Sequence, residues 1–115
     1  GPHDDVREMV REFENRRDIM VSRLREIPGV SCNTPNGSFY SFPDFSALYG
    51  KKDANGKVLQ GSLDFTEYLL TAKKIAIVPG IAFGADANAR MSFATSLDKI
   101  EEGVKRIKEA VELLR

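Results

Sequence analysis

The chain has 115 residues, 42% of them apolar, with Lys plus Arg and Asp plus Glu equal at 17 each. This length suits one domain with a single core, and the balanced charge argues against a nucleic-acid or anionic-membrane partner. The single cysteine argues against an internal disulfide and a cysteine-rich metal site, and the single histidine, near the N-terminus, argues against a histidine-dependent triad. The sequence has no apolar run long enough to span a membrane. These features fit a cytoplasmic protein.

Residues 4–27 are predicted to form a long amphipathic helix. Their apolar side chains recur at helical spacing with charged residues between them, and Pro28 with Gly29 supplies a stop. Arg17 interrupts the apolar stripe, which favours a helix that packs on a domain, partly in contact with solvent, over a coiled coil. The stripe consists of Val6, Met9, Val10, Phe13, Met20, Leu24 and Ile27.

Two short strands are expected next, at residues 30–32 and 38–42, with a turn between them. The second strand contains a run of aromatic residues and ends at Pro43. Asn36 and Gly37 tolerate positive φ and favour a tight turn, although Gly37 could also let the backbone approach a ligand. Residues 44–61 are polar and rich in turn residues, so we expect a surface loop that includes a small hairpin.

A second helix is predicted from Ser62 or Asp64 to the basic pair at residues 73–74. Asp64 and Glu67 have the spacing of a capping box, and lysines suit a helix C-terminus. The expected apolar face is made of Leu63, Tyr68, Leu69, Leu70 and Ala72.

The stretch that follows this helix is the best candidate for a binding site. The apolar run 75–78 predicts a strand that is covered on both faces or central in a small sheet, and two glycines frame an aromatic turn in residues 79–84. A further strand at residues 90–94 begins with Arg90 and alternates, with Met91 and Phe93 on one face. Arg90 could bind a ligand anion at this loop or pair with a local Asp or Glu, and the residues alone leave both open.

A final helix completes the predicted fold. Ser96 is expected to cap it, and its apolar stripe is Leu97, Ile100, Val104, Ile107, Val111 and Leu114. The order helix, strand, strand, helix, strand, strand, helix predicts a two-layer α/β (α+β) sandwich, with three main helices packed on a small mixed or antiparallel sheet. Residues 1–115 are expected to form this one domain.

Four ordered motifs stand out in the sequence. They are Asn-Gly-Ser-Phe-Tyr-Ser-Phe-Pro at 36–43, Asp-Phe with Tyr-Leu-Leu within 64–70, Ile-Val-Pro-Gly with Ala-Phe-Gly within 77–84, and Arg-Met-Ser-Phe-Ala at 90–94. Together they resemble the C-terminal small domain of the class I and II aminotransferases, which are fold-type-I pyridoxal-phosphate enzymes, above all the bacterial aspartate aminotransferases. The likeness runs from about Gly1 to Arg115, and a Gly-Lys-Lys and Asn-Gly-Lys loop at residues 50–57 strengthens it.

The resemblance implies that Arg90 binds the α-carboxylate of the substrate and that Gly37 lies at a turn near it. A guanidinium suits this role because its planar fork matches a carboxylate with two parallel hydrogen bonds. Tyr40 and Phe83 are expected in the core or the pocket wall, and Cys32 as a small buried apolar residue.

The resemblance also implies transamination between aspartate and 2-oxoglutarate with pyridoxal 5'-phosphate as the cofactor and electron sink. In the family, the cofactor lysine, the aspartate that pairs with the pyridine nitrogen and the phosphate-binding groups belong to the large domain, and no stretch of this sequence resembles them. We therefore expect a fragment that closes the active site over the substrate. It would hold no catalytic, cofactor-binding or metal-binding residue of its own, and it would be inactive alone.

The implied partners are amino-acid and 2-oxo-acid substrates, the large domain of the same chain and a second subunit in a parent homodimer, with no nucleic acid and no membrane. Two alternatives remain. One is another fold-type-I enzyme, such as an acyl-transferring synthase or a different transaminase. The other is a free-standing, non-enzymatic domain that binds a carboxylate or a protein surface, since a fold alone does not determine function.

Overall fold

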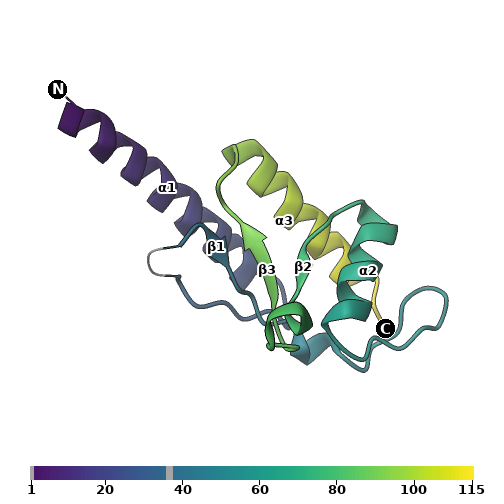
Figure 1. Cartoon of the computed structure of the whole chain (residues 1–115). Helices are drawn as coiled ribbons and strands as arrows, with labels where there is room; N and C mark the ends of the chain where they lie inside the picture. The colour runs from purple at the N-terminus through teal and green to yellow at the C-terminus, as the bar shows by residue number, and fades with distance from the viewer. Residues whose placement is uncertain (1, 36–37) are drawn as a thin grey trace.

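Helix α1, Pro2–Arg25, is the longest element, and its N-terminal half projects beyond the rest of the molecule (Figure 1). The computed structural model describes residues 2–35 and 38–115. Met20 and Leu24, in the C-terminal half of α1, are buried, whereas Val6 and Met9 are more than half exposed. The predicted long amphipathic helix is confirmed, but only its C-terminal half packs on the domain.

The sheet has three short antiparallel strands, β1 (Tyr40–Ser41), β2 (Val78–Pro79) and β3 (Ala89–Ser92), in the order β1-β3-β2. With its three helices, this sheet confirms the predicted α/β fold class. The prediction that the 75–78 run is central or covered on both faces is wrong, because β3 is central and the run is only partly buried or exposed. Pro79 gives the physical reason: it has no N–H to donate and is tolerated in an edge strand.

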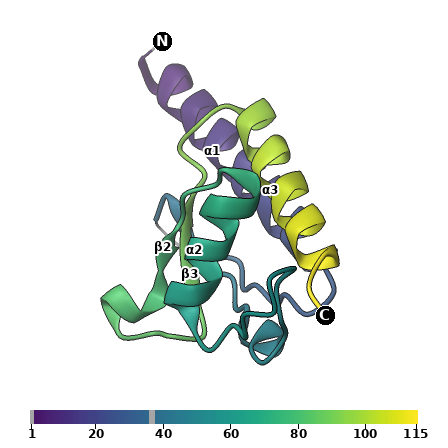
Figure 2. The same ribbon diagram turned by 90° about the vertical axis from the view of Figure 1, so that its right-hand side faces the viewer.

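Helix α3, Leu97–Glu112, packs against α1 (Figure 2). The Ser96 side chain accepts a hydrogen bond from the backbone N–H of Lys99, so the predicted cap is confirmed. The predicted stripe is also confirmed, since Ile100 and Ile107 are almost fully buried and Leu97 is partly buried. These side chains share one core with the helix-facing side of β3 and with the C-terminal half of α1.

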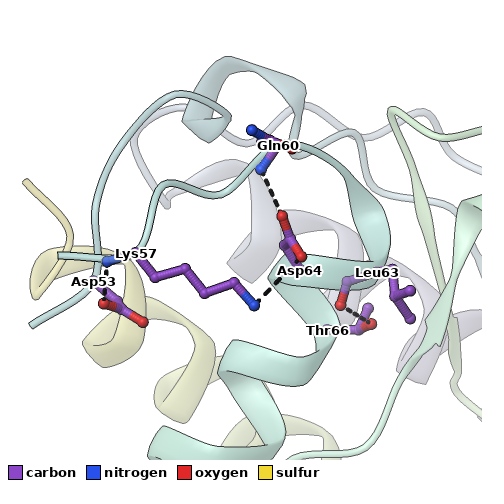
Figure 3. Close-up of polar contacts among 6 residues, drawn as sticks. All are labelled: Asp53, Lys57, Gln60, Leu63, Asp64 and Thr66. Carbon is purple, nitrogen blue, oxygen red and sulfur yellow. Dashed lines mark hydrogen bonds and ion pairs between the residues drawn. The ribbon is translucent and has the colours of Figure 1, made fainter. Parts of the chain in front are cut away.

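Helix α2, Ser62–Lys73, has the predicted bounds but a different cap and a different buried face. Its N-cap is Gly61, and the Ser62 N–H is bound instead by the Asp86 carboxylate at 3.0 Å, which comes from a distant turn. Asp64 reaches back to the backbone N–H of Gln60 at 3.0 Å and pairs with Lys57 at 3.5 Å (Figure 3). The first turn of α2 is therefore held from both sides by carboxylates.

The predicted apolar face of α2 is partly wrong. Leu63 and Leu70 are more than half exposed, whereas Phe65 and Leu69 are fully buried. Phe65 stacks on Phe45 with ring centroids 4.5 Å apart, so an aromatic contact with the preceding loop decides which side of α2 faces inward.

Two predictions for the first half of the chain also need correction. Residues 30–32 form no regular strand; they make only an isolated bridge between Ser31 and Asp44. The 44–61 segment contains the expected hairpin contact between Lys52 and Val58, yet it is not merely a surface loop. It contains the 3-10 helix η1, Ser46–Leu48, and it contributes the buried side chains Phe45, Leu48 and Leu59 to the core.

Candidate functional site

Arg90 lies on β3, the central strand of the sheet. Its backbone is opposite Val78 of β2, while Met91 is opposite Ser41 of β1, so both neighbours hold this strand in place. The predicted alternation is confirmed: Met91 points into the core, Arg90 is partly buried and Ser92 is exposed. The Arg90 side chain therefore leaves the sheet on the face opposite the core.

The Arg90 guanidinium lies over the ring of Tyr40, with its central carbon 4.5 Å from the ring centroid. Among the residues that the structure describes, no Asp or Glu oxygen lies within the 4.0 Å limit of an ion pair with Arg90. The alternative in which Arg90 pairs with a local acid is thus not realised in the described part of the chain. The hydrogen-bonding edge of this cation has no acidic partner there.

A cavity of about 310 Å³ opens beside Arg90. Two cations, Arg90 and Lys99, contribute to its lining, and no acidic residue does so. Its other walls are mainly apolar, including Ile75, Ile77 and Met91. Apolar walls with few convergent polar groups are typical of small-molecule sites, and an excess of positive charge favours an anion.

The loop between β2 and β3 holds Arg90 next to this cavity. Its 3-10 helix η2, Gly80–Phe83, starts at a buried glycine whose backbone is bound to Asn88 and Ala85 at 2.8 Å each. A Cβ atom on Gly80 would lie 1.8 Å from the Ala85 carbonyl oxygen, so only glycine fits. Gly84 ends the helix at a φ of +78°, which also favours glycine.

Ser62 and Asp86 tie this loop to the start of α2. The Ser62 hydroxyl donates to Asp86 Oδ1 at 2.8 Å and accepts the Ile81 N–H at 3.0 Å. Hydrogen bonds from the Ser62 N–H and then its hydroxyl hold the pKa of Asp86 below its ordinary value. Sequence reasoning missed this contact, because the two residues are far apart in the chain and no local motif links them.

Tyr49 adds a second contact to the same turn. Its hydroxyl donates to the backbone carbonyl of Asp86 at 2.7 Å. Burial, followed by the negative charges of Asp86 and Asp44, raises the pKa of Tyr49 to about 12. The phenol therefore remains a hydrogen-bond donor at neutral pH.

The remaining predicted site residues have different outcomes. Gly37 lies outside the described residues, so its predicted place near the substrate remains a prediction. Tyr40 lines the cavity, as expected of a pocket wall. Phe83 is not in the core: it is exposed and meets Phe42 edge-on at 5.7 Å. Cys32 is buried as expected, and burial raises the pKa of its thiol.

The described residues contain neither a cluster of metal ligands nor a buried lysine. Over residues 2–35 and 38–115, no three His, Cys, Asp or Glu side chains gather as metal ligands. Within the same ranges no lysine is buried: Lys73 is partly buried and the other lysines are exposed. No described helix is long and apolar enough to cross a membrane.

Comparison with known proteins identifies the family. The family model described as aminotransferase class I and II matches residues 2–107. A probable aspartate/prephenate aminotransferase from Aquifex aeolicus is 47% identical over 109 residues, which is 95% of this chain and 26% of the relative. An aspartate aminotransferase from Bacillus subtilis is 43% identical over 112 residues, 97% of this chain and 27% of the relative.

Solved structures give the same result. The aspartate aminotransferase from Rhizobium meliloti superposes on all of this chain with a TM-score of 0.96 and 38% identity, and the match covers 29% of that protein. The chain thus spans less than a third of the length of these relatives. Since the family model covers most of the sequence and the structural match covers all of it, this chain belongs to the class I and II aminotransferase family.

Proposed function

We propose that this chain is the C-terminal small domain of a longer, pyridoxal-phosphate-dependent aspartate aminotransferase, in which Arg90 binds the α-carboxylate of the substrate. The observation that carries the proposal is the state of Arg90. Arg90 lies on the central strand and lines a mainly apolar cavity, and no described acid pairs with its guanidinium.

This arrangement suits carboxylate binding for electrostatic reasons. A partly buried guanidinium without a counter-ion is stabilised by an incoming anion, and the cavity wall offers no competing carboxylate. Two parallel N–H···O bonds would fix the carboxylate plane and so the orientation of the α-carbon attached to it. Holding a reactant in the correct orientation can lower the activation free energy of a reaction by several kcal/mol, on the order of 7 kcal/mol or more for well-positioned groups.

The cofactor and the groups that hold it are proposed to lie in the part of the longer protein outside this chain. Three facts support this division. The chain spans 29% of the Rhizobium meliloti enzyme, the described lysines are not buried, and the cavity beside Arg90 is open to its surroundings. In this view the large domain and a second subunit of a homodimer complete the site. Closure of the small domain over the substrate then excludes water.

The single cysteine supports a cytoplasmic location, which stays a prediction.

The test compares the full-length protein with this chain. With aspartate and 2-oxoglutarate, the full-length protein should form oxaloacetate, followed with malate dehydrogenase and NADH. Because relatives are named aspartate/prephenate aminotransferases, prephenate should be tried as a second amino acceptor. The 115-residue chain with added pyridoxal phosphate should show no turnover. Turnover by this chain alone, or a full-length protein inactive with aspartate, would contradict the proposal.

A further inference from the structure

We propose that Tyr40 is a positioning residue for Arg90: its ring supports the guanidinium and limits the orientations in which the side chain offers its N–H donors to a carboxylate. The inference rests on the proposed function of Arg90 and adds to it a second residue that no motif assigns to substrate binding. Its basis is the contact between the two side chains, 4.5 Å from the guanidinium carbon to the ring centroid.

The register of the sheet brings the two side chains together. Tyr40 of β1 is directly opposite Ser92 of β3, and Arg90 is two residues before Ser92 on the same face. Diagonal neighbours of this kind lie about 7–8 Å apart at their Cα atoms, a distance that an aromatic ring and an arginine can span. A bond from the Phe93 N–H to the Phe39 carbonyl at 2.9 Å continues the pairing of β1 with β3.

Stacking restrains the guanidinium in a way that suits its proposed role. An arginine side chain has several rotatable bonds, and on an open face it would sample many orientations. The guanidinium carbon lies over the Tyr40 ring, which attracts the cation. We infer that this contact leaves N–H donors of the guanidinium available to a ligand. A carboxylate that approaches in this plane meets two donors already in place.

The position of Tyr40 argues against a purely structural role. Its side chain is 39% exposed, so the ring contributes less to the core than the buried aromatic residues Phe45 and Phe65 do. It also lines the same cavity as Arg90. Phe39, the preceding residue, is exposed as well, but its ring meets Phe13 in a tilted contact instead of Arg90, which makes it a matched control.

The test uses the full-length enzyme with four variants: Tyr40→Leu, Tyr40→Phe, Phe39→Leu and Arg90→Lys, together with the Tyr40→Leu/Arg90→Lys double variant. Two quantities are measured: kcat/KM for aspartate, and the Kd of succinate, a dicarboxylate that cannot react. Tyr40→Leu should lower kcat/KM and raise the Kd of succinate, each by about five- to thirtyfold, the range between an exposed and a desolvated cation–π contact. Tyr40→Phe, which keeps the ring, and Phe39→Leu should stay within about twofold of the parent enzyme.

The double variant separates positioning from a general structural effect. If Tyr40 acts through Arg90, Tyr40→Leu should change little once Arg90 is lysine, so the two effects will not add. Additive losses, an unchanged Tyr40→Leu enzyme, or an equal loss in Tyr40→Phe would each overturn the inference. If Arg90→Lys itself has no effect, the proposed function fails as well. A loss in Arg90→Lys without one in Tyr40→Leu overturns only the role of Tyr40.

Discussion

Gly80→Ala tests whether the loop that precedes Arg90 is packed as described. The added Cβ would lie 1.8 Å from the Ala85 carbonyl oxygen and 2.2 Å from the Asn88 carbonyl oxygen. Both obstacles are backbone atoms, so no rotation of a side chain can relieve the overlap. Overpacking costs about 1–3 kcal/mol and occasionally more, and we expect the upper end, about 3 kcal/mol or more, because the backbone of two residues must move.

Gly103 provides a matched control within the same chain. It lies in α3, and a Cβ atom there would meet nothing within 4 Å. Gly103→Ala should therefore stabilise the fold by about 0.5–1 kcal/mol, the usual difference between alanine and glycine inside a helix. Both variants introduce the same methyl group, and only its surroundings differ.

Thermal unfolding followed by circular dichroism measures the difference. In a domain of this size 1 kcal/mol corresponds to about 4 °C in Tm, so Gly80→Ala should lower Tm by about 10 °C or more, and Gly103→Ala should raise it by about 2–4 °C. If Gly80→Ala instead melts within about 2 °C of the parent chain, the close approach of the 80–88 loop is wrong.

Three further predictions concern pH and surface. The pKa of Asp86 is lower in the folded chain than its ordinary value, so its contribution is present above that ordinary value and is lost as pH falls through the lowered pKa. Urea unfolding from about pH 6 to about pH 2 should show a steeper acid loss for the parent than for Asp86→Asn, and equal slopes would contradict the Ser62 contact. The pKa of Tyr49 is raised to about 12, so the folded chain holds this proton more tightly and loses stability as pH rises from about 10 to about 12. Tyr49→Phe should reduce this alkaline loss, part of which remains because burial also raises the pKa of Tyr68, and an unchanged loss would contradict the role of Tyr49. Ile81 and Phe83 are exposed and apolar, so the isolated chain should self-associate weakly through them. In sedimentation, Ile81→Ser with Phe83→Ser should reduce this association, whereas a strictly monomeric parent chain at high concentration would refute it.

The elements in which apolar side chains recur at a regular spacing were predictable from the sequence. The stripe on α3 and the alternation of Arg90 to Ser92 each follow from the repeat of one kind of secondary structure, and neither depends on distant partners. Both were confirmed. Pro79, the residue that makes β2 an edge strand, was visible in the sequence, but the apolar run before it favoured a central strand.

The contacts that complete the site depend on pairings that no local pattern contains. Asp86 binds Ser62 from another turn, and Tyr40 meets Arg90 only through the register of β1 on β3. Leu48 and Leu59 are buried although they lie in a polar, turn-rich segment. The local composition indicated a loop there, and a loop was found. Which of its side chains are buried depends instead on the side that faces α2 and the core, because tertiary packing overrides local preference.

The role of Arg90 is tested most directly by Arg90→Lys in the full-length enzyme. Lysine keeps the charge but not the two-point geometry, so the loss should appear in substrate binding and in the chemical step, and not in cofactor affinity. The matched control is Arg106→Lys, which changes a partly exposed arginine that pairs with Glu102 within α3 and lies 3.4 Å from the Lys73 carbonyl.

The decisive measurement is kcat/KM for aspartate alongside Tm, for the parent enzyme and for both variants. Each charge-assisted hydrogen bond contributes about 1.5–3 kcal/mol, and each 1.4 kcal/mol corresponds to about tenfold in rate, so Arg90→Lys should lower kcat/KM by about 100-fold or more with little change in Tm. Arg106→Lys should leave both near the parent values. Unchanged kcat/KM for Arg90→Lys beside a clear fall in Tm would show that Arg90 is a structural residue and remove it from the site.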